Sequence, residues 1–136
     1  MAVWYSILVR SFADSNGDGI GDIPGLIQSL DYFSELGVDG LWLLPIHPAP
    51  SYHKYDVVNY HQIDPEYGTM HDFKRLLKEA HRRGIKIMMD LVLNHCSERH
   101  HWFRQAMQGK KSLSQLVCME RCRTCYNRGT ISLAYS

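Results

Sequence analysis

The sequence lacks the features that mark a secreted, membrane-spanning or strongly charged protein. Its first ten residues, MAVWYSILVR, contain no basic segment followed by an apolar core and a small-residue cleavage site, and no apolar run reaches the length of a membrane span. Fifteen Lys and Arg stand against 14 Asp and Glu, so no overall field attracts nucleic acid, a membrane surface or a polyanion. We therefore expect a cytoplasmic protein with no nucleic-acid or membrane partner, and nothing indicates an obligate protein partner.

Cysteine is scarce and unevenly placed. Three of the four cysteines, Cys118, Cys122 and Cys125, are bunched near the C-terminus, which is not the pattern of a disulfide framework. Their spacing matches that of the iron–sulfur site of radical S-adenosylmethionine enzymes, but in those enzymes a whole domain follows the motif. Three thiolates also lack the fourth ligand of a closed zinc site. We interpret the arrangement as accidental, and a metal-dependent redox protein is the alternative.

Composition indicates one globular domain followed by an atypical tail. The chain is 45% hydrophobic and 21% charged, as is usual for a folded domain. Residues 108–136 contain five Lys or Arg, one Glu and no Asp. We therefore predict a domain over residues 1–107 and a Cys-containing tail over residues 108–136, either appended or read out of frame.

Hydrophobic patterning predicts alternating strands and helices. The expected strands are Val3–Phe12, Val38–Pro45 and Ile85–Leu93, and the second of these reads as a parallel strand covered on both faces. One helix is expected from Pro24 to Gly37, and a second over Thr69–Gly84 with Thr69 as N-cap and Gly84 just past its end. This order predicts a parallel α/β sheet built from βαβ units.

The loop after the first predicted strand has the residues of a cation site. Asp14, Asn16, Asp18 and Asp22 alternate with glycines, and Ile20 offers a backbone carbonyl. Calcium prefers six to eight oxygen ligands, and the spacing matches the first nine positions of an EF-hand loop. A glycine stands at position twelve in place of the bidentate Glu. The alternative is an Asx-rich turn that satisfies its own backbone.

Polar residues end the third predicted strand. Asp90, Asn94 and His95 lie where parallel α/β barrels gather ligands and catalytic groups. Asn94 offers a carbonyl oxygen to a hard cation, and His95 offers a ring nitrogen to a sugar hydroxyl or a carboxylate. For Asp90 we favour a structural role. Each of the three also suits a hydrogen-bonded polar residue with no ligand.

A second polar and aromatic segment follows the second predicted strand. Within SYHKYD, the Tyr55 ring suits stacking on a sugar and His53 suits binding its hydroxyls. Exposed Tyr and His are common in loops, so the segment alone is weak evidence for a binding site. Its position one strand before DLVLNH makes a carbohydrate subsite the better interpretation.

Together these segments resemble a known family. The stretches YSILVRSFADSNGDGIGD, SYHKYDVVNY, DPEYGT, HRRGIKIMMDLVLNH and HHWF closely resemble the N-terminal part of the α-amylase superfamily of glycoside hydrolases, from about Trp4 to about Ala106. The sequence is similar to bacterial α-amylases, oligo-1,6-glucosidases and trehalose synthases. The resemblance implies an incomplete (β/α)8 TIM barrel with the first three strands and their intervening helices. It also implies cleavage or transfer of α-glucosidic bonds with retention, in an α-glucan or small α-glucoside.

The resemblance also assigns roles to residues. The loop ligands named above would hold calcium, and Asn94 would bind a second calcium. Tyr55 would stack on the sugar beside the scissile bond, while His53 and His95 would bind its hydroxyls. Asp90 would be structural.

Two departures and one absence qualify the resemblance. Lys54 stands where the family commonly has Gly and is expected to crowd the sugar subsite, and Cys96 stands where Thr is usual. Retaining chemistry needs two carboxyl groups about 5 Å apart, and in this superfamily they lie on later strands. We therefore expect a fragment that is inactive alone. The alternative is a non-catalytic amylase-like module that binds carbohydrate or calcium, or another protein.

Overall fold

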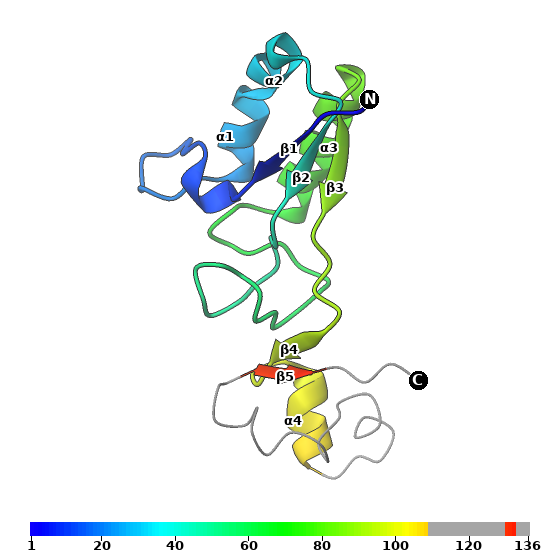
Figure 1. Ribbon diagram of the computed structural model, residues 1–136. Coiled ribbons are helices and arrows are strands. Elements are labelled where there is room, and N and C mark those ends of the chain that lie inside the picture. The colour runs from blue at the N-terminus through cyan, green and yellow to red at the C-terminus, as the bar shows by residue number, and fades with distance from the viewer. Residues whose placement is uncertain (109–129, 133–136) are drawn as a thin grey trace. The chain divides into compact units, whose positions relative to one another are not determined.

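The computed structural model describes residues 1–108 and 130–132, which belong to two compact units. The first unit contains residues 1–46 and 62–90, and the second contains residues 47–61 and 91–136 (Figure 1). Cys118, Cys122 and Cys125 lie outside the described residues. Within the described ranges, no helix is long and apolar enough to cross a lipid bilayer.

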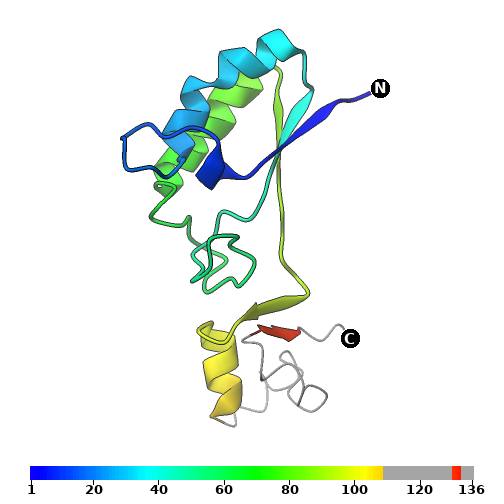
Figure 2. The ribbon, with the colours of Figure 1, turned by 60° about the vertical axis from the view of Figure 1, so that its left-hand side comes forward.

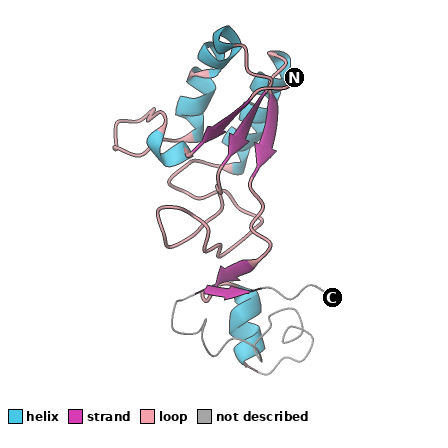
Figure 3. Ribbon diagram, in the orientation of Figure 1, coloured by secondary structure: helices cyan, strands magenta, loops and turns pink. Residues whose placement is uncertain are grey.

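The first unit is a parallel sheet with helices on one face. Its strands, in spatial order, are β1 (Trp4–Ile7), β2 (Gly40–Leu43) and β3 (Lys86–Met89). All pairings are parallel, so the predicted sheet is confirmed. Three helices cover one side of it (Figures 2 and 3): α1 (Ile23–Gln28), α2 (Leu30–Leu36) and α3 (Met70–Arg82).

Helix α3 forms where the sequence predicts it, because both of its ends carry clear signals. Thr69 and Asp72 form a capping box, with Asp72 N donating to Thr69 Oγ1 at 3.2 Å and Thr69 N donating to Asp72 Oδ2 at 2.9 Å. Gly84 follows the C-cap residue Arg83 with a φ of 75°, a left-handed conformation that glycine adopts without strain.

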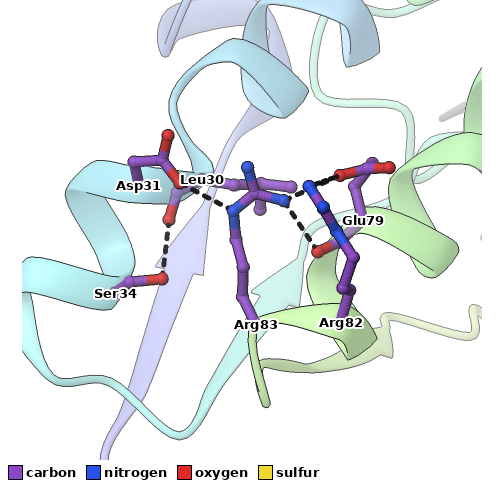
Figure 4. Close-up of polar contacts among 6 residues, drawn as sticks. All are labelled: Leu30, Asp31, Ser34, Glu79, Arg82 and Arg83. Atoms are coloured by element: carbon purple, nitrogen blue, oxygen red, sulfur yellow. Dashed lines mark hydrogen bonds and ion pairs between the residues drawn. The ribbon is translucent and has the colours of Figure 1, made fainter.

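Ion pairs join the C-terminal end of α3 to α2. Arg83 Nε donates to Asp31 Oδ1 at 2.7 Å, and an Arg83 guanidinium nitrogen lies 2.8 Å from Glu79 Oε2 (Figure 4). Arg82 also contacts Glu79 Oε2, at 2.7 Å. The hydrogen bond from Arg83 lowers the pKa of the Asp31 carboxyl. These groups are partly exposed, so each pair contributes little stability.

The predicted first strand and first helix both need correction. The strand ends at Ile7, and a 3₁₀ turn (η1, Val9–Ser11) follows because Ser11 N and Phe12 N bond to the carbonyls three residues earlier. The single helix expected up to Gly37 is two helices that meet at Ser29. The Ser29 hydroxyl donates to the Gly25 carbonyl at 3.0 Å, a competing bond that bends helices.

The prediction that the second strand is covered on both faces is wrong within the first unit. Leu41 and Leu43 face the helices and are fully buried, whereas Trp42 points to the other face and is 41% exposed. Trp4 and Met88 are exposed to a similar extent, and Trp42 and Met88 are register partners. The sheet therefore has a buried aliphatic face and an open aromatic face. Strands β2 and β3 are also shorter than predicted.

The second unit contains a short hairpin and a helix. Strand β4 (His95–Ser97) pairs antiparallel with β5 (Thr130–Ser132), and helix α4 spans His101–Met107. Cys96, Phe103 and Ala106 form a small core with the Tyr60 and Trp102 side chains against it. Residues 47–61 join this core, since Ser97 N donates to the Val57 carbonyl at 2.9 Å. The sequence patterns did not predict β4.

Candidate functional site

The Asp14–Asp22 loop is organised by side chains that accept backbone hydrogen bonds. Asp14 accepts from Asn16 N (3.0 Å) and Gly17 N (2.7 Å) through Oδ1, and from Gly19 N (2.8 Å) through Oδ2. These donors, Gly19 foremost and then Gly17, lower the pKa of the Asp14 carboxyl. Gly17 and Gly19 have φ values of 82° and 86°, which L residues rarely adopt.

The same pattern continues through the rest of the loop. Asn16 Oδ1 accepts from Asp18 N at 2.9 Å, and Asp18 Oδ1 accepts from Ile20 N at 2.8 Å. The chain thus advances in two-residue Asx turns. In each turn a side-chain oxygen faces the backbone N–H group two residues later in the loop.

Asp22 connects the loop to the first helix. It is 4% exposed, and its Oδ1 accepts from Gly25 N at 2.6 Å as the N-cap of α1. Its Oδ2 accepts from the backbone N (3.2 Å) and hydroxyl (2.7 Å) of Ser15. A Cβ on Gly25 would lie 2.2 Å from the Ala13 carbonyl oxygen, so only glycine fits this turn.

The chemistry of these donors fits a hard cation. Three carboxylates, one amide oxygen and one backbone carbonyl are the ligand types that calcium prefers, and a carboxylate oxygen that accepts one N–H keeps a further lone pair. Among the described residues, however, no group of three or more His, Cys, Asp or Glu side chains is placed to hold a metal ion. The hydrogen bonds of the loop are those of a self-satisfied Asx turn, and the calcium loop stays a prediction.

The predicted sugar-binding residues His53 and Tyr55 lie together in the second unit. Their ring centroids are 6.0 Å apart, and Tyr55 N donates to His53 Nδ1 at 3.2 Å. Because Nδ1 accepts this bond, the neutral ring carries its proton on Nε2. Ser51 Oγ lies 3.1 Å from the same Nδ1, and its hydroxyl donates to Asp56 Oδ1. His53 thus presents an N–H donor beside an aromatic ring.

Lys54 does not occupy the position expected from the sequence. Its side chain is 4% exposed and turns back into the second unit, where Nζ lies 3.4 Å from the Ala49 carbonyl oxygen. The Lys54 side chain therefore does not crowd the predicted sugar subsite. The residue has a φ of 62°, a conformation that suits glycine better.

The polar residues after β3 are divided between the units. Asp90 is half-buried in the first unit, and its backbone N extends the ladder by donating to the Leu43 carbonyl at 2.8 Å. Asn94 is exposed in the second unit, and His95 begins β4 there with a half-buried side chain. The predicted sugar-binding residues His53, Tyr55 and His95 thus share one unit, and Asp90, predicted to be structural, lies in the other.

Sequence reasoning missed the residues that hold these segments in place. The Tyr60 hydroxyl is within hydrogen-bonding distance of the carbonyls of Val92 (2.6 Å) and His95 (3.0 Å). His100, 1% exposed, caps α4 by accepting from Trp102 N at 3.1 Å. Burial, aided by other histidines, lowers the pKa of His100 to about 4. Histidine is not a favoured N-cap, so no sequence rule indicated this role.

Cys96, the second departure from the resemblance, is a buried core residue. Its thiol is fully covered, and burial raises its pKa to about 11. The neutral thiol is therefore a packing group of the second unit and has little nucleophilic character.

Comparison with known proteins identifies the family. The family model described as "Alpha amylase, catalytic domain" matches residues 6–120. Alpha-amylase 3 of Dictyoglomus thermophilum is 57% identical over 75% of this chain and 20% of its own length, and the oligo-1,6-glucosidase of Parageobacillus thermoglucosidasius is 54% identical over 80% and 20%. The crystal structure of the alpha-amylase from H. orenii superposes with a TM-score of 0.80 at 49% identity, covering 85% of this chain and 25% of that one.

The chain therefore spans about a fifth of the length of the curated relatives it matches. Its three parallel strands, with helices on one face, are consistent with part of the barrel of such enzymes. Since the catalytic-domain model covers most of the chain and the relatives share more than half of its aligned residues, the chain belongs to the alpha-amylase family.

Proposed function

We propose that the chain is the first part of a retaining glycoside hydrolase or transglycosidase that acts on an α-glucan or a small α-glucoside, and that it supplies part of the glucose subsite. The observation that carries this proposal is the His53–Tyr55 pair, with ring centroids 6.0 Å apart and an Nε2–H donor beside an aromatic ring. Such a pair suits a sugar, which presents an apolar ring face next to hydroxyl groups. Membership of the alpha-amylase family supports the same substrate class.

Each subsite residue has a separate task in this proposal. Tyr55 stacks on the sugar ring, while His53 Nε2–H and the His95 ring bind hydroxyls. Asp90 keeps the end of β3 in register through its backbone bond to Leu43. None of these groups attacks the anomeric carbon or protonates the leaving group.

The chain alone is proposed to be inactive. Retaining hydrolysis needs a nucleophilic and an acid/base carboxyl group about 5 Å apart. The carboxylates that the sequence places near the predicted rim of the subsite are Asp56, which accepts from the Ser51 hydroxyl, and Asp90, which lies in the other unit. The family resemblance assigns a catalytic role to neither.

Calcium is part of the proposal. Asp14, Asn16, Asp18, Asp22 and the Ile20 carbonyl would hold one ion, and Asn94 would contribute to a second. A bound ion would supply rigidity to the loop between β1 and α1. Its effect would extend to the first helix, because Asp22 also caps α1.

Sugar binding tests the subsite. Maltose titrated into the full 136-residue chain should shift the NMR signals of Tyr55 and His53. Tyr55→Ala should abolish these shifts, whereas Tyr55→Phe should keep the stacking. Tyr32→Ala is the control, because Tyr32 is an exposed tyrosine of the first unit with no assigned role. Unchanged affinity in Tyr55→Ala would contradict the subsite.

An activity assay tests the other half of the proposal. No glucose should be released from maltose, trehalose or starch by the purified chain. Robust turnover would show that the chain contains a complete catalytic pair and that the fragment interpretation is wrong.

A further inference from the structure

We propose that Lys54 is a positioning residue, whose buried side chain holds the turn that brings the His53 and Tyr55 rings together. The importance of this turn for sugar binding rests on the proposed function. The effect of Lys54 on the two rings does not rest on that function, because the geometry of the rings can be measured without a sugar.

The backbone of Lys54 adopts an unfavourable conformation. Its φ of 62° lies in the left-handed region, and among the described residues it is the one non-glycine residue with a positive φ. For an L residue with a Cβ, this conformation persists only where the surrounding structure holds it. Something in the second unit must therefore offset the strain.

The side chain of Lys54 supplies an interaction that offsets this strain. A lysine ammonium is strongly hydrated and is rarely buried without polar partners, yet Lys54 is only 4% exposed. Its Nζ lies 3.4 Å from the Ala49 carbonyl oxygen, and its backbone N donates to the Ser51 carbonyl, also at 3.4 Å. Two hydrogen bonds of Lys54 thus stabilise the turn, one from its backbone N and one from its side chain.

The turn at Lys54 decides how its two neighbours meet. Tyr55 N donates to His53 Nδ1 at 3.2 Å, and this hydrogen bond spans Lys54. If the backbone at Lys54 relaxed to an extended conformation, Tyr55 N would point away from the imidazole. The His53 tautomer that places a proton on Nε2 would then lose its support.

NMR of the full-length chain tests the proposal with three variants. Lys54→Met keeps the stem and removes the ammonium, while Lys54→Arg restores a cation and is the conservative rescue. Lys54→Ala removes the side chain and keeps the strained φ, so it remains informative if Lys54→Met does not fold. The readouts are the cross-peak between the His53 and Tyr55 rings and the ¹⁵N shift of His53 Nδ1.

Lys54→Met and Lys54→Ala should both weaken the ring cross-peak and move the Nδ1 shift, and Lys54→Arg should restore them. The Trp102 indole signal, from the core of the same unit, should stay in place and report intact folding. An unchanged cross-peak and Nδ1 shift in either Lys54→Met or Lys54→Ala would overturn the proposal.

A maltose titration of the same variants connects the turn to the subsite. Affinity should fall roughly tenfold in Lys54→Met, because the ligand must then order the two rings itself. If the wild-type chain binds no maltose while the ring signals respond as expected, the proposed function fails and the positioning role of Lys54 stands. Altered rings with unaltered maltose affinity would overturn the link between the turn and the subsite.

Discussion

The Asp14–Asp22 loop and the His53–Tyr55 turn are both held by side chains that accept backbone N–H groups, but they differ in how far their supports extend. In the first, the bonds from Asp14, Asn16 and Asp18 reach two to five residues along the chain. The unit that contains the His53–Tyr55 turn also depends on Tyr60, which joins segments that are distant in sequence, and on His100, whose polar ring is buried. The first loop is therefore a local structure, and the second depends on the packing of its unit.

Among changes in or beside the Asp14–Asp22 loop, Gly25→Ala is expected to lower the unfolding free energy most. The new Cβ would lie 2.2 Å from the Ala13 carbonyl oxygen, so the backbone between the loop and α1 must shift. We expect a loss of about 3 kcal/mol in unfolding free energy, measured by urea denaturation. Gly17→Ala, where the new Cβ has open space and only the backbone φ of 82° is strained, is the control and should cost about 1 kcal/mol. Equal losses would show that steric contact at Gly25 is not the cause.

Calcium bound by the Asp14–Asp22 loop should stabilise the first unit. At a free calcium concentration one hundred times the dissociation constant, binding adds about 2.7 kcal/mol. Hydrogen exchange of the amides in α1 should slow with calcium and return to its original rate with a chelator. Asp18→Ala should abolish this response in α1. Exchange in α4, which belongs to the unit of Asn94, should be the same in Asp18→Ala as in the wild-type chain. No slowing in α1 would favour the self-satisfied Asx turn.

Acid should act in the opposite way and weaken the second unit. The folded-state pKa of His100 is about 4, below its ordinary value of 6.5, so the unfolded chain binds the proton more tightly. The stabilising contribution is complete above pH 6.5 and is lost as the pH falls towards 4, by about 3 kcal/mol. The Trp102 indole signal should report this loss before that of Trp42. His100→Asn, which keeps a capping side chain, should flatten the profile, and an unchanged profile would assign the titration to other groups.

Thr69→Ala should have the smallest effect, although it removes a clearly predicted feature. The variant loses the hydroxyl that accepts from Asp72 N at 3.2 Å, and α3 should lose about 1 kcal/mol. Thermal unfolding followed by circular dichroism measures this loss. Thr69→Ser, which keeps the hydroxyl, is the control. A loss as large as that of Gly25→Ala would mean that the cap supports more than its own helix.

Prediction from the sequence succeeded where neighbouring residues determine the conformation. The capping box at Thr69 and the left-handed Gly84 bound α3 within one or two residues of the expected range. His53 and Tyr55 are close in sequence, but the turn that pairs their rings involves the buried Lys54 side chain, which the sequence did not indicate. The split at Ser29 was not predicted, because a hydroxyl bond to a helix carbonyl leaves no distinct pattern in the sequence.

The order of strands and helices, the oxygen-rich loop and the family resemblance were determined by the sequence itself, because turns, caps and hydrophobic periodicity act over a few residues. Tertiary structure decided which face of β2 is open at Trp42, that Lys54 turns inward, and that His100 is a buried neutral cap. Those outcomes depend on solvent exclusion by residues far away in the chain, and burial of this kind is a property of the packed unit.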